Sequence, residues 1–383
     1  MAAPKLRFKE FDQIWDNLKY KDVLTIKYGK DHKLLNEGEF PVYGTGGVMR
    51  YADQYLHDGE SILIGRKGTI DQPKYVNEKF WTVDTLFYTQ IKDNSIPLFL
   101  YQHALQVNWL GLNEATGVPS LNTTSINNVD IALPSKEEQT KIATFLSAVD
   151  EKIAQLSQKL HLLEQYKQGM MQKIFSQQIR FKAGDGSEFG EWEYYKLGEL
   201  TTLITKGTTP TSLGGKFENS GINFIKIESL SSDGKFLLDK FAYIDEVTHN
   251  KLARSQLENE DILFSIAGAL GRVAIISNDY LPANTNQALA IIRLRNKNII
   301  RYIYYFLNSD YVKKIIETES VQLAQANFSL GQLSDLDIVL PCIEEQTKIA
   351  NFLSSIDQKI EVVAQQIEQA KLWKKGLLQQ MFV

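Results

Sequence analysis

Two segments of the chain, residues 133–175 and 340–382, carry the same pattern of hydrophobic positions. Apolar residues recur at alternating steps of four and three over 142–174 and again over 349–381. The offset is constant, because 349 − 142 and 381 − 174 both equal 207, and about half of the paired positions are identical. A heptad pattern sustained over about five heptads predicts two long helices of the coiled-coil type.

A lysine interrupts each apolar seam at the same place, Lys167 in the first copy and Lys374 in the second. Helices of this kind gain most of their stability from packing, so we expect the two seams to bury each other. Packed antiparallel, helices of about 39 residues and roughly 58 Å would hold one domain at either end under a pseudo-two-fold axis. The lysines either fix the helix register or extend their charges into solvent at frayed ends.

The segments outside the two helices read as mixed domains. The first domain is predicted at 1–134, a central spacer helix at 135–183, a second domain at 184–340 and a C-terminal helix at 341–383. The turn-forming residues 184–187 give the clearest linker signal. The predicted fold class is α+β: two mixed α/β domains separated by two long helices in an antiparallel coiled coil, as a pseudo-two-fold tandem repeat.

Local patterns give the expected elements of the two mixed domains. In the first domain we expect a short helical opening at 15–18, a glycine-rich turn at 40–48 and a helix at 96–106. Strands are predicted at 61–65, 80–88 and 129–134 from their apolar, aromatic and β-branched content. The second domain repeats this plan, with strands predicted at 261–265 and 336–341.

Composition narrows the class of protein. No apolar run approaches the roughly 20 residues of a membrane helix, and the first 15 residues lack the apolar core of a signal peptide. The single cysteine, Cys342, excludes an intramolecular disulfide framework and indicates a reducing compartment, so we expect the cytoplasm. The net charge of −4 weakly disfavours nucleic-acid binding, so DNA would require a locally basic face or a partner that supplies charge.

The repeated segment Glu-Glu-Gln-Thr-Lys-Ile-Ala, at 137–143 and 344–350, follows a proline in both copies and closes two divergent domains. In this the chain resembles the specificity subunit of type I restriction–modification enzymes, over essentially its whole length. The resemblance implies a non-catalytic DNA-binding subunit whose two target-recognition domains each read one half of a split target. It also implies that the coiled coil sets the spacing between the halves. The two domains share little beyond their framework, so we expect the two half-sites to differ.

The same resemblance implies the partners. They are double-stranded DNA, two methyltransferase subunits and motor–nuclease restriction subunits, with adenine as the methylated base and no membrane. AdoMet, ATP and Mg belong on those partner subunits, so no cofactor is expected in this chain.

Motifs for chemistry are missing from the sequence itself. The chain has no Pro-Pro, and an adenine methyltransferase needs an Asn/Asp-Pro-Pro-Tyr/Phe loop. The glycine cluster 44–47 fails the dinucleotide pattern, and no Walker lysine follows a glycine loop. A metal site is not expected, because there is one cysteine and the histidines are scattered at His32, His57, His103, His161 and His249.

Candidate DNA contacts lie in polar loops beside predicted strands. Arginine can bind guanine O6 and N7, asparagine can bind adenine, and lysine or threonine can hold phosphate. The loop 66–69 is the main candidate of the first domain, with a solvated loop as the alternative. Asparagines of the second domain could equally cap a turn, and Lys226 could face solvent. The candidates are Tyr43, Thr45, Arg66, Lys67, Thr69, Lys206, Thr208, Thr209, Lys226, Arg272, Asn284 and Asn286.

The starts of the two helices are candidate docking faces for the methyltransferase, although their acids could instead serve only as helix caps. The residues are Glu137, Glu138, Lys141, Glu344, Glu345 and Lys348. Half-sites read from one DNA face should lie about 34 Å apart, centre to centre. If each half-site occupies about three to five base pairs, this spacing leaves a gap of roughly five to eight unread base pairs. The alternative function is a coiled-coil scaffold that binds protein and not DNA, and a self-contained enzyme ranks third.

Overall fold

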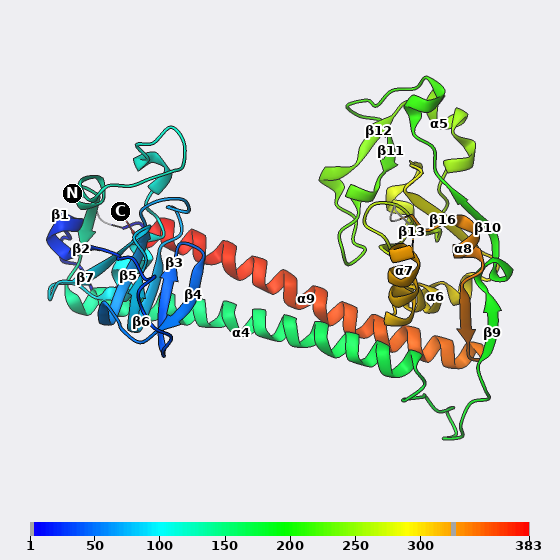
Figure 1. Ribbon diagram of the computed structural model, residues 1–383, viewed down its shortest axis with the longest axis horizontal. Coiled ribbons are helices and arrows are strands. Elements are labelled where there is room, and N and C mark those ends of the chain that lie inside the picture. Colours follow the sequence, from blue (N-terminus) through cyan, green and yellow to red (C-terminus); the bar gives the residue numbers. More distant parts are fainter. Residues whose placement is uncertain (1–3, 323–326, 383) are drawn as a thin grey trace. The chain divides into compact units, whose positions relative to one another are not determined.

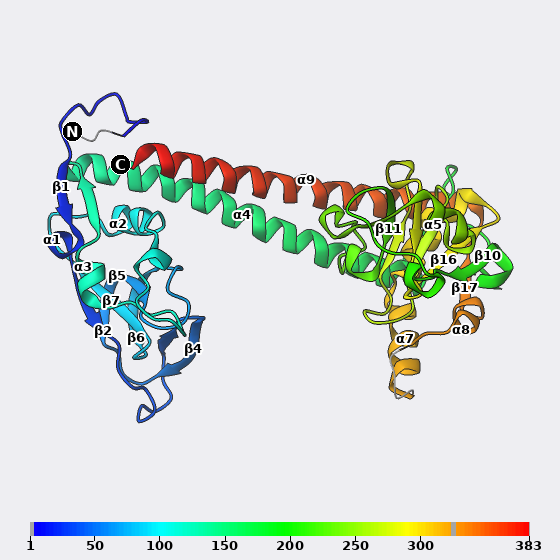
Figure 2. The same ribbon diagram turned by 90° about the horizontal axis from the view of Figure 1, so that it is seen from above.

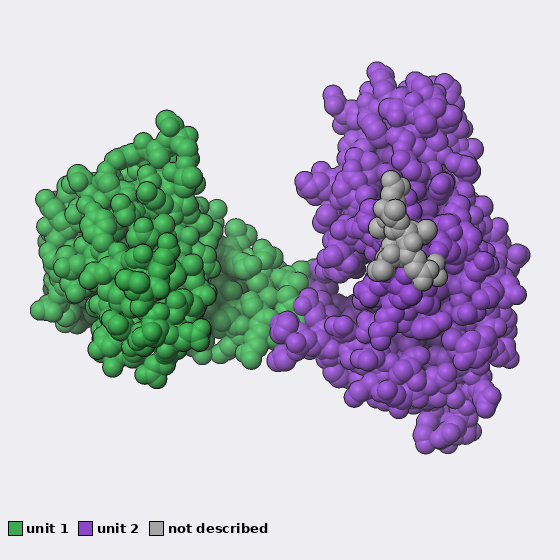
Figure 3. Space-filling model, viewed as in Figure 1, with its two compact units in different colours: residues 1–160, 363–383 green, residues 161–362 purple. Residues whose placement is uncertain are grey.

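The computed structural model describes residues 4–322 and 327–382 (Figure 1). The chain forms two compact units, residues 1–160 with 363–383 and residues 161–362 (Figure 3). The long helices α4 (Lys136–Phe175) and α9 (Ile343–Met381) each contribute to both units. Each compact unit therefore combines one mixed domain with a piece of both helices. No helix in the described ranges is long and apolar enough to cross a membrane.

The first unit is built on a six-stranded sheet in the order β2-β7-β5-β6-β3-β4. Neighbouring strands are antiparallel except β3 and β6, which run parallel. The strands are β2 (Leu24–Tyr28), β3 (Phe40–Gly44), β4 (Gly47–Ala52), β5 (His57–Gly65), β6 (Lys74–Thr82) and β7 (Leu86–Ile91). Figure 2 shows α2 (Pro97–Ala104) between the sheet and α4, where Phe99 and Leu100 join the core.

Two local predictions for this unit are wrong. Residues 15–18 were expected to be helical, but Asp16–Lys19 form strand β1, which pairs with β8 (Asp130–Leu133) and leads into α1 (Tyr20–Val23). The backbone of β8 supplies the hydrogen bonds that override local propensity. The expected strand 80–88 is two strands, because a turn closed by Leu86 N donating to Val83 O (3.0 Å) separates β6 from β7. The helix at 96–106 and the strands at 61–65 and 129–134 are confirmed within a few residues.

The second unit divides its strands between two sheets. One has the order β10-β16-β13-β14 and the other β12-β11-β15. Their bounds are β10 (Thr201–Lys206), β11 (Ile222–Ile225), β12 (Ala242–Ile244), β13 (Ile262–Ser265), β14 (Val273–Ile275), β15 (Ala283–Thr285) and β16 (Leu289–Leu294). A separate pair, β9 (Glu193–Lys196) with β17 (Asp337–Leu340), is the counterpart of β1 with β8. The predicted strands at 261–265 and 336–341 are therefore confirmed.

Helices surround these sheets in the second unit. They are α5 (Glu246–Lys251), α6 (Ile300–Leu307), α7 (Asp310–Gln322) and α8 (Leu330–Ser334). Helix α6 lies at the centre of the core. Its residues Tyr302, Ile303 and Phe306 are buried and pack among residues of β13, β16 and both long helices. In the first unit α3 (Thr123–Asn127) precedes β8.

Within each unit the segments of α4 and α9 pack antiparallel (Figure 1 and Figure 2). In the first unit Lys374 meets Asp150 and the ring of Trp373 meets that of Phe145 at 6.1 Å. In the second unit Lys167 meets Asp357. Every predicted seam position is buried or half-buried. The heptad pattern thus identified the packed face of both helices correctly.

The framework contacts occur twice. Trp15 lies 6.3 Å from Phe99, and Trp192 lies 6.3 Å from Tyr302, measured between ring centroids. The chain before each tryptophan is held in the same way, because Leu6 N donates to Gln380 O (2.9 Å) and Ile179 N donates to Lys173 O (3.2 Å). Because 380 − 173 is also 207, these bonds extend the tandem repeat beyond the helices.

Candidate nucleic-acid interface

The second glutamate of the repeated motif is a buried structural residue in the first unit. Glu138 is 1% exposed and accepts two hydrogen bonds of 2.7 Å from Nε and Nη2 of Arg7. The indole Nε1 of Trp15 donates a third bond of 3.1 Å to the same carboxylate. Hydrogen bonding to Glu138 raises the pKa of the Arg7 guanidinium further above its ordinary value. This triad ties the chain segment before β1 to the first turn of α4.

The second unit repeats this triad. Glu345 is fully buried and accepts bonds of 3.2 and 2.7 Å from Arg180 and one of 3.0 Å from Trp192. The predicted docking role of Glu138 and Glu345 is therefore wrong, because neither carboxylate reaches the surface. The two glutamates recur at the offset of 207 because the same contacts occur twice within the chain. Their recurrence therefore does not indicate a docking surface for a partner.

The motif lysines also bind their own chain. Lys141 pairs with Glu10 at 3.0 Å and lies over the Phe8 ring. Lys348 donates to Lys182 O at 2.6 Å and pairs with Glu344 at 3.2 Å. Of the six predicted docking residues, Glu137 remains as an exposed carboxylate with no ion pair within residues 4–322 and 327–382. The motif as a whole therefore serves mainly to attach each domain to its helix.

A glycine hairpin and a basic loop lie together in the first unit. The turn predicted at 40–48 is much shorter in the structure, because Phe40–Gly44 belong to β3 and β4 begins at Gly47, so only Thr45 and Gly46 form the turn. A Cβ built on Gly68, whose φ is +87°, would lie 4.0 Å from Thr45 Oγ1. One built on Gly47 would lie 3.6 Å from Lys74 Nζ. The hairpin and the loop after β5 therefore form one surface.

This surface presents cations that are not neutralised. Lys67 is exposed and Lys74 half-buried, and neither has an ion pair in the part of the chain that the structure describes. Arg66 stacks over the ring of Tyr28 at 5.4 Å, and its Nη1 donates to Asp84 O at 3.1 Å. No other acceptor bonds this guanidinium among the residues that the structure describes, so the rest of its fork is left for a ligand. Hydroxyl and cationic groups on a glycine-containing loop are suited to phosphate and to base edges.

Tyr43 and Thr69 complete the predicted residues of the first unit. Thr69 is exposed beside the loop. The Tyr43 hydroxyl donates to Glu78 at 2.5 Å, and partial burial with this carboxylate raises its pKa well above the ordinary value. Tyr43 thus stays protonated and is engaged with its own sheet. We name Thr45, Arg66, Lys67, Thr69 and Lys74 the first basic surface.

The second unit has a different basic surface. The loop after β10 lies against β15, since Thr208 N donates to Thr285 O at 3.1 Å. Arg254 reaches the same loop and donates from Nη2 to Thr208 Oγ1 at 2.8 Å. Thr209 Oγ1 donates to Gln287. We name Lys206, Thr208, Thr209, Arg254 and Gln287 the second basic surface.

Lys74, Tyr28 and Arg254 were missed from the sequence. Arg254 lies 46 positions from Thr208, and Lys74 lies 27 positions from Gly47. No local pattern relates them, because strand pairing and loop packing bring them together. Arg254 and Lys206 are exposed and have no carboxylate partner among the described residues.

Two predicted contact residues of the second unit, Asn284 and Arg272, bind their own chain instead. Asn284 is fully buried and bonds His249 and Leu252 O, so its predicted role in reading adenine is wrong. Arg272 donates to the carbonyls of Ile227 and Leu230, so its guanidinium holds a loop and its prediction is also wrong.

Lys226 and Asn286 are only partly available. Lys226 follows β11 and pairs with Glu228 at 2.6 Å. Asn286 Oδ1 accepts from Ala288 N at 3.2 Å, which is the turn cap that the sequence left open. Among the described residues, no three His, Cys, Asp or Glu side chains are grouped as metal ligands would be.

Known proteins are similar to this chain in sequence and in fold. The family profile of the type I restriction modification DNA specificity domain matches residues 13–165 and 190–372. A type I restriction enzyme MjaVIII specificity subunit from Methanocaldococcus jannaschii is 27% identical over 84% of this chain and 76% of its own length. The EcoBI specificity subunit from Escherichia coli is 22% identical over 85% of this chain and 73% of its own.

A solved structure has the same fold. The crystal structure of the S subunit of a type I restriction–modification system from M. genitalium covers 100% of this chain, and 99% of that chain is matched. The TM-score is 0.64 at 16% identity. The two regions that the family profile matches, residues 13–165 and 190–372, each cover one mixed domain and most of the long helix that follows it. The chain belongs to the family of type I restriction–modification specificity subunits.

Proposed function

We propose that the chain is the non-catalytic DNA-reading subunit of its complex, and that each basic surface reads one half of a split target. The observation that supports this most is the contrast between repeated framework contacts and unrepeated basic surfaces. The first surface stands on a β-hairpin and the loop after β5. The second stands on the loop after β10 with Arg254. Dissimilar surfaces on one framework are suited to dissimilar half-sites.

Contacts to bases and to phosphates divide within each surface. Arg66 and Arg254 offer planar forks that match guanine O6 and N7, whereas Lys67, Lys74 and Lys206 offer point charges suited to phosphate. The net charge of −4 does not oppose this assignment, because the unpaired cations are local to the two loops.

The proposed complex adds the partners that the family resemblance implies. Two methyltransferase subunits would carry AdoMet and modify adenine, and motor–nuclease subunits would carry ATP and Mg, in the cytoplasm. The paired helices would act as the ruler between half-sites, with a gap of roughly five to eight base pairs.

The experiment is a binding titration of the chain with its methyltransferase partner on duplex DNA at several salt concentrations. The DNA-reading role predicts an affinity that falls linearly on a log–log plot as salt rises, with one split sequence bound far more tightly than others. Equal affinity for all duplexes would reject sequence reading. No salt-dependent DNA binding, with retention of a protein partner, would favour the scaffold alternative.

A further inference from the structure

Strands β2 and β10 each end beside a buried glycine, Gly29 in the first unit and Gly207 in the second. A Cβ on Gly29 would lie 1.9 Å from Val83 O, and one on Gly207 would lie 2.0 Å from Thr285 O. Only glycine, which has no Cβ, allows the backbone to approach a carbonyl this closely. We call these two places the first and second glycine corners.

The backbone hydrogen bonds around the two corners correspond one to one. They run from Gly29 N to Leu86 O (3.1 Å) and Lys30 N to Thr82 O (2.8 Å), and from Gly207 N to Leu289 O (3.4 Å) and Thr208 N to Thr285 O (3.1 Å). Between the units both donors shift by 178 positions (207 − 29 and 208 − 30), and both acceptors shift by 203 (289 − 86 and 285 − 82). The loop after β10 therefore corresponds to the loop after β2, which is not part of the first basic surface.

The loop after β5 also has a counterpart, the loop after β13. Leu121 N donates to Arg66 O at 2.9 Å, and Phe328 N donates to Ile266 O at 2.8 Å. Ile266 thus stands where Arg66 stands in the first unit, but it is apolar and only 5% exposed. The second unit must therefore present its cations from other positions.

Two positive groups stand at the first glycine corner. The Arg66 guanidinium lies 5.4 Å from the centroid of the Tyr28 ring, which is 52% exposed. Lys30 is exposed and has no ion pair within residues 4–322 and 327–382. The neighbouring Asp31 carboxylate accepts from Lys33 N at 3.0 Å. This corner therefore combines an arginine fork at position 28 with a lysine at position 30.

The second glycine corner has the same two kinds of cation in the reverse order. Lys206 is exposed and stands at the position that corresponds to Tyr28. Arg254 donates from Nη2 to Thr208 Oγ1 at 2.8 Å, so its fork stands at the position that corresponds to Lys30. An arginine and a lysine thus recur beside each glycine, although they come from positions that do not correspond in sequence.

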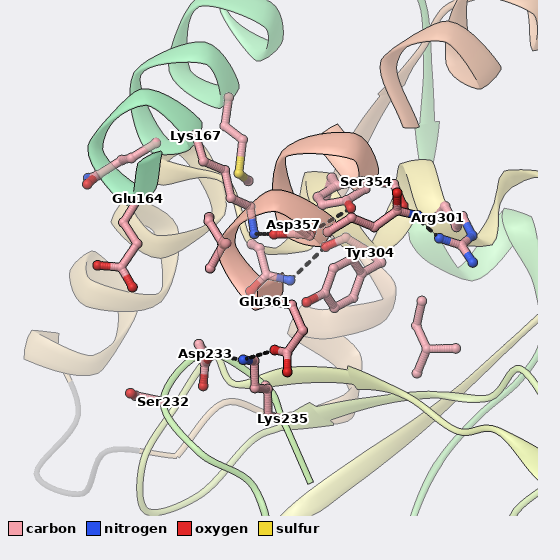
Figure 4. Close-up of a pocket in the computed structure, with 18 of the residues that line it drawn as sticks. Glu164, Lys167, Ser232, Asp233, Lys235, Arg301, Tyr304, Ser354, Asp357 and Glu361 are labelled. Atoms are coloured by element: carbon pink, nitrogen blue, oxygen red, sulfur yellow. Dashed lines mark hydrogen bonds and ion pairs between the residues drawn. The ribbon is translucent and has the colours of Figure 1, made fainter. Parts of the chain in front are cut away.

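Lysines on and beside the long helices are neutralised, in contrast to those at the corners. Figure 4 shows Lys167 directed at Asp357 in a cavity of about 720 Å³, with 2.6 Å between their charged atoms. Lys235 pairs with Glu361 at the same cavity, also at 2.6 Å. The side chains of the seam lysines Lys167 and Lys374 are 24% and 12% exposed. The alternative that the seam lysines extend into solvent at frayed ends is therefore wrong.

Duplex DNA offers both units the same backbone, whatever its sequence. Phosphates repeat along every duplex, whereas base edges change with the letters. A lysine suited to phosphate beside an arginine fork suited to guanine can hold the backbone and read a base edge from one corner. Exchange of the two cations about the glycine moves the fork relative to the phosphate contact, and it therefore changes which base edge the fork meets.

We infer that the two glycine corners are equivalent DNA contacts, that Lys30 is a further phosphate contact of the first unit, and that Tyr28 is a positioning residue for Arg66. The reversed order of arginine and lysine lets the two units read different letters from corresponding places in the framework. This inference rests on the proposed function, because it names residues that carry out the reading.

Removal of Lys30 tests the phosphate contact. The chain with its methyltransferase partner is titrated on the split target and on an unrelated duplex at several salt concentrations. Lys30→Ala should weaken binding to both duplexes alike and reduce the slope of log affinity against log salt by about one unit. Lys21→Ala is the matched control, because Lys21 is exposed, lacks an ion pair among the described residues and lies on α1, at the other end of β2. Its slope should equal that of the wild type.

Two substitutions of Tyr28 test its positioning role, with selection from randomised duplexes as the readout. Tyr28→Ala removes the ring beneath the guanidinium and should reduce the preference at one position of the first half-site about tenfold. Tyr28→Phe keeps the ring and should retain that preference. The letters of the second half-site should be unchanged in both variants, which also shows that the chain is folded.

Three results would overturn the inference while the wild type still binds one split target. They are an unchanged salt slope in Lys30→Ala, an unchanged preference in Tyr28→Ala, and an equal loss of preference in Tyr28→Phe and Tyr28→Ala. A wild type that binds all duplexes equally would instead reject the proposed function, and the inference with it.

Discussion

Trp15 and Trp192 occupy equivalent places and make equivalent contacts, whereas the loops that carry the basic surfaces have no such correspondence. Each indole donates to a buried glutamate at the start of a long helix. The first domain then builds one six-stranded sheet, and the second builds sheets of four and three strands. Geometry is thus repeated where a domain meets the helices and varies where it faces outward. The proposed reading of two different sequences on one framework requires this division.

The largest expected effect is on the repeated triads. Glu138→Ala and Glu345→Ala each leave a guanidinium and an indole without their acceptor, so each should lower the free energy of unfolding by about 3 kcal/mol. Because the triads are equivalent, the two losses should agree within about 1 kcal/mol. Urea unfolding measures both.

The neighbouring Glu137→Ala is the matched control for the triads. Its carboxylate is exposed, so a change within about 0.5 kcal/mol is expected. A loss at Glu137 as large as that at Glu138 would show that the motif stabilises the helix start generally and not through the triad.

A second difference between the units is a buried histidine. His103 lies 5.9 Å from the Phe382 ring, and Phe306 lies 5.4 Å from the equivalent Phe175. Burial lowers the pKa of His103 to about 4, from about 6.5 in the unfolded chain. The unfolded state therefore binds this proton more readily, and the stabilisation by neutral His103 is fully present above pH 6.5. It should fall by about 3 kcal/mol as the pH drops from 6.5 to 4.

The double variant Tyr20→Phe with His103→Phe should remove this part of the pH dependence. Tyr20→Phe alone is the control, because it removes only the hydroxyl that bonds His103 Nδ1 at 2.9 Å. Urea unfolding at pH 7, 5.5 and 4.5 measures the difference. Parallel pH profiles for the double variant and its control would contradict the assignment.

Substitutions in the two basic surfaces should affect the two half-sites independently. Arg66→Ala should relax one half-site and Arg254→Ala the other, each with a loss of about 1–3 kcal/mol in binding. Arg66→Lys and Arg254→Lys keep the charge without the planar fork, so they should retain non-specific affinity and still lose base preference. Selection from randomised duplexes reports each position. Relaxation of both half-sites by one arginine would remove the distinction between the surfaces.

The smallest expected effect on DNA affinity is that of substituting the lysines. Lys74→Ala and Lys206→Ala should weaken binding almost equally on all sequences and reduce the salt slope by about one unit each. A titration of affinity against salt on a matched and a mismatched duplex measures this. A change in half-site letters from either variant would move that lysine from phosphate to base contact.

The framework was largely predictable from the sequence, because it is encoded by a period. The heptad seam, its offset of 207 and the paired Lys167 and Lys374 identified the helices and their antiparallel packing. The sequence could not identify Asp150 and Asp357 as partners, because the pairing joins residues 224 and 190 positions apart. The helix predicted at 15–18 was wrong for a similar reason. Asp16–Lys19 form a strand because they pair with β8, which lies more than 100 residues away in the sequence.

The interface was only partly predictable. Arg66, Lys67 and Thr69 could be predicted to share one polar loop, because glycine and charge cluster locally there, and their contact with DNA stays a prediction. The prediction that Asn284 contacts DNA was wrong, because the sequence around a polar residue in a loop-like stretch does not indicate that its side chain is buried. Local composition thus indicates which loops are polar, but tertiary packing decides which of their side chains remain free.

The central claim is that each half of the chain reads its own half of a target. Methylome sequencing of cells that carry the complete complex tests it most directly, with the wild-type chain and with Arg66→Ala compared. We expect adenine methylation at a motif of two dissimilar halves with a fixed gap, and relaxation of one half only in the variant. Methylation at one uninterrupted motif, or equal relaxation of both halves, would contradict the account.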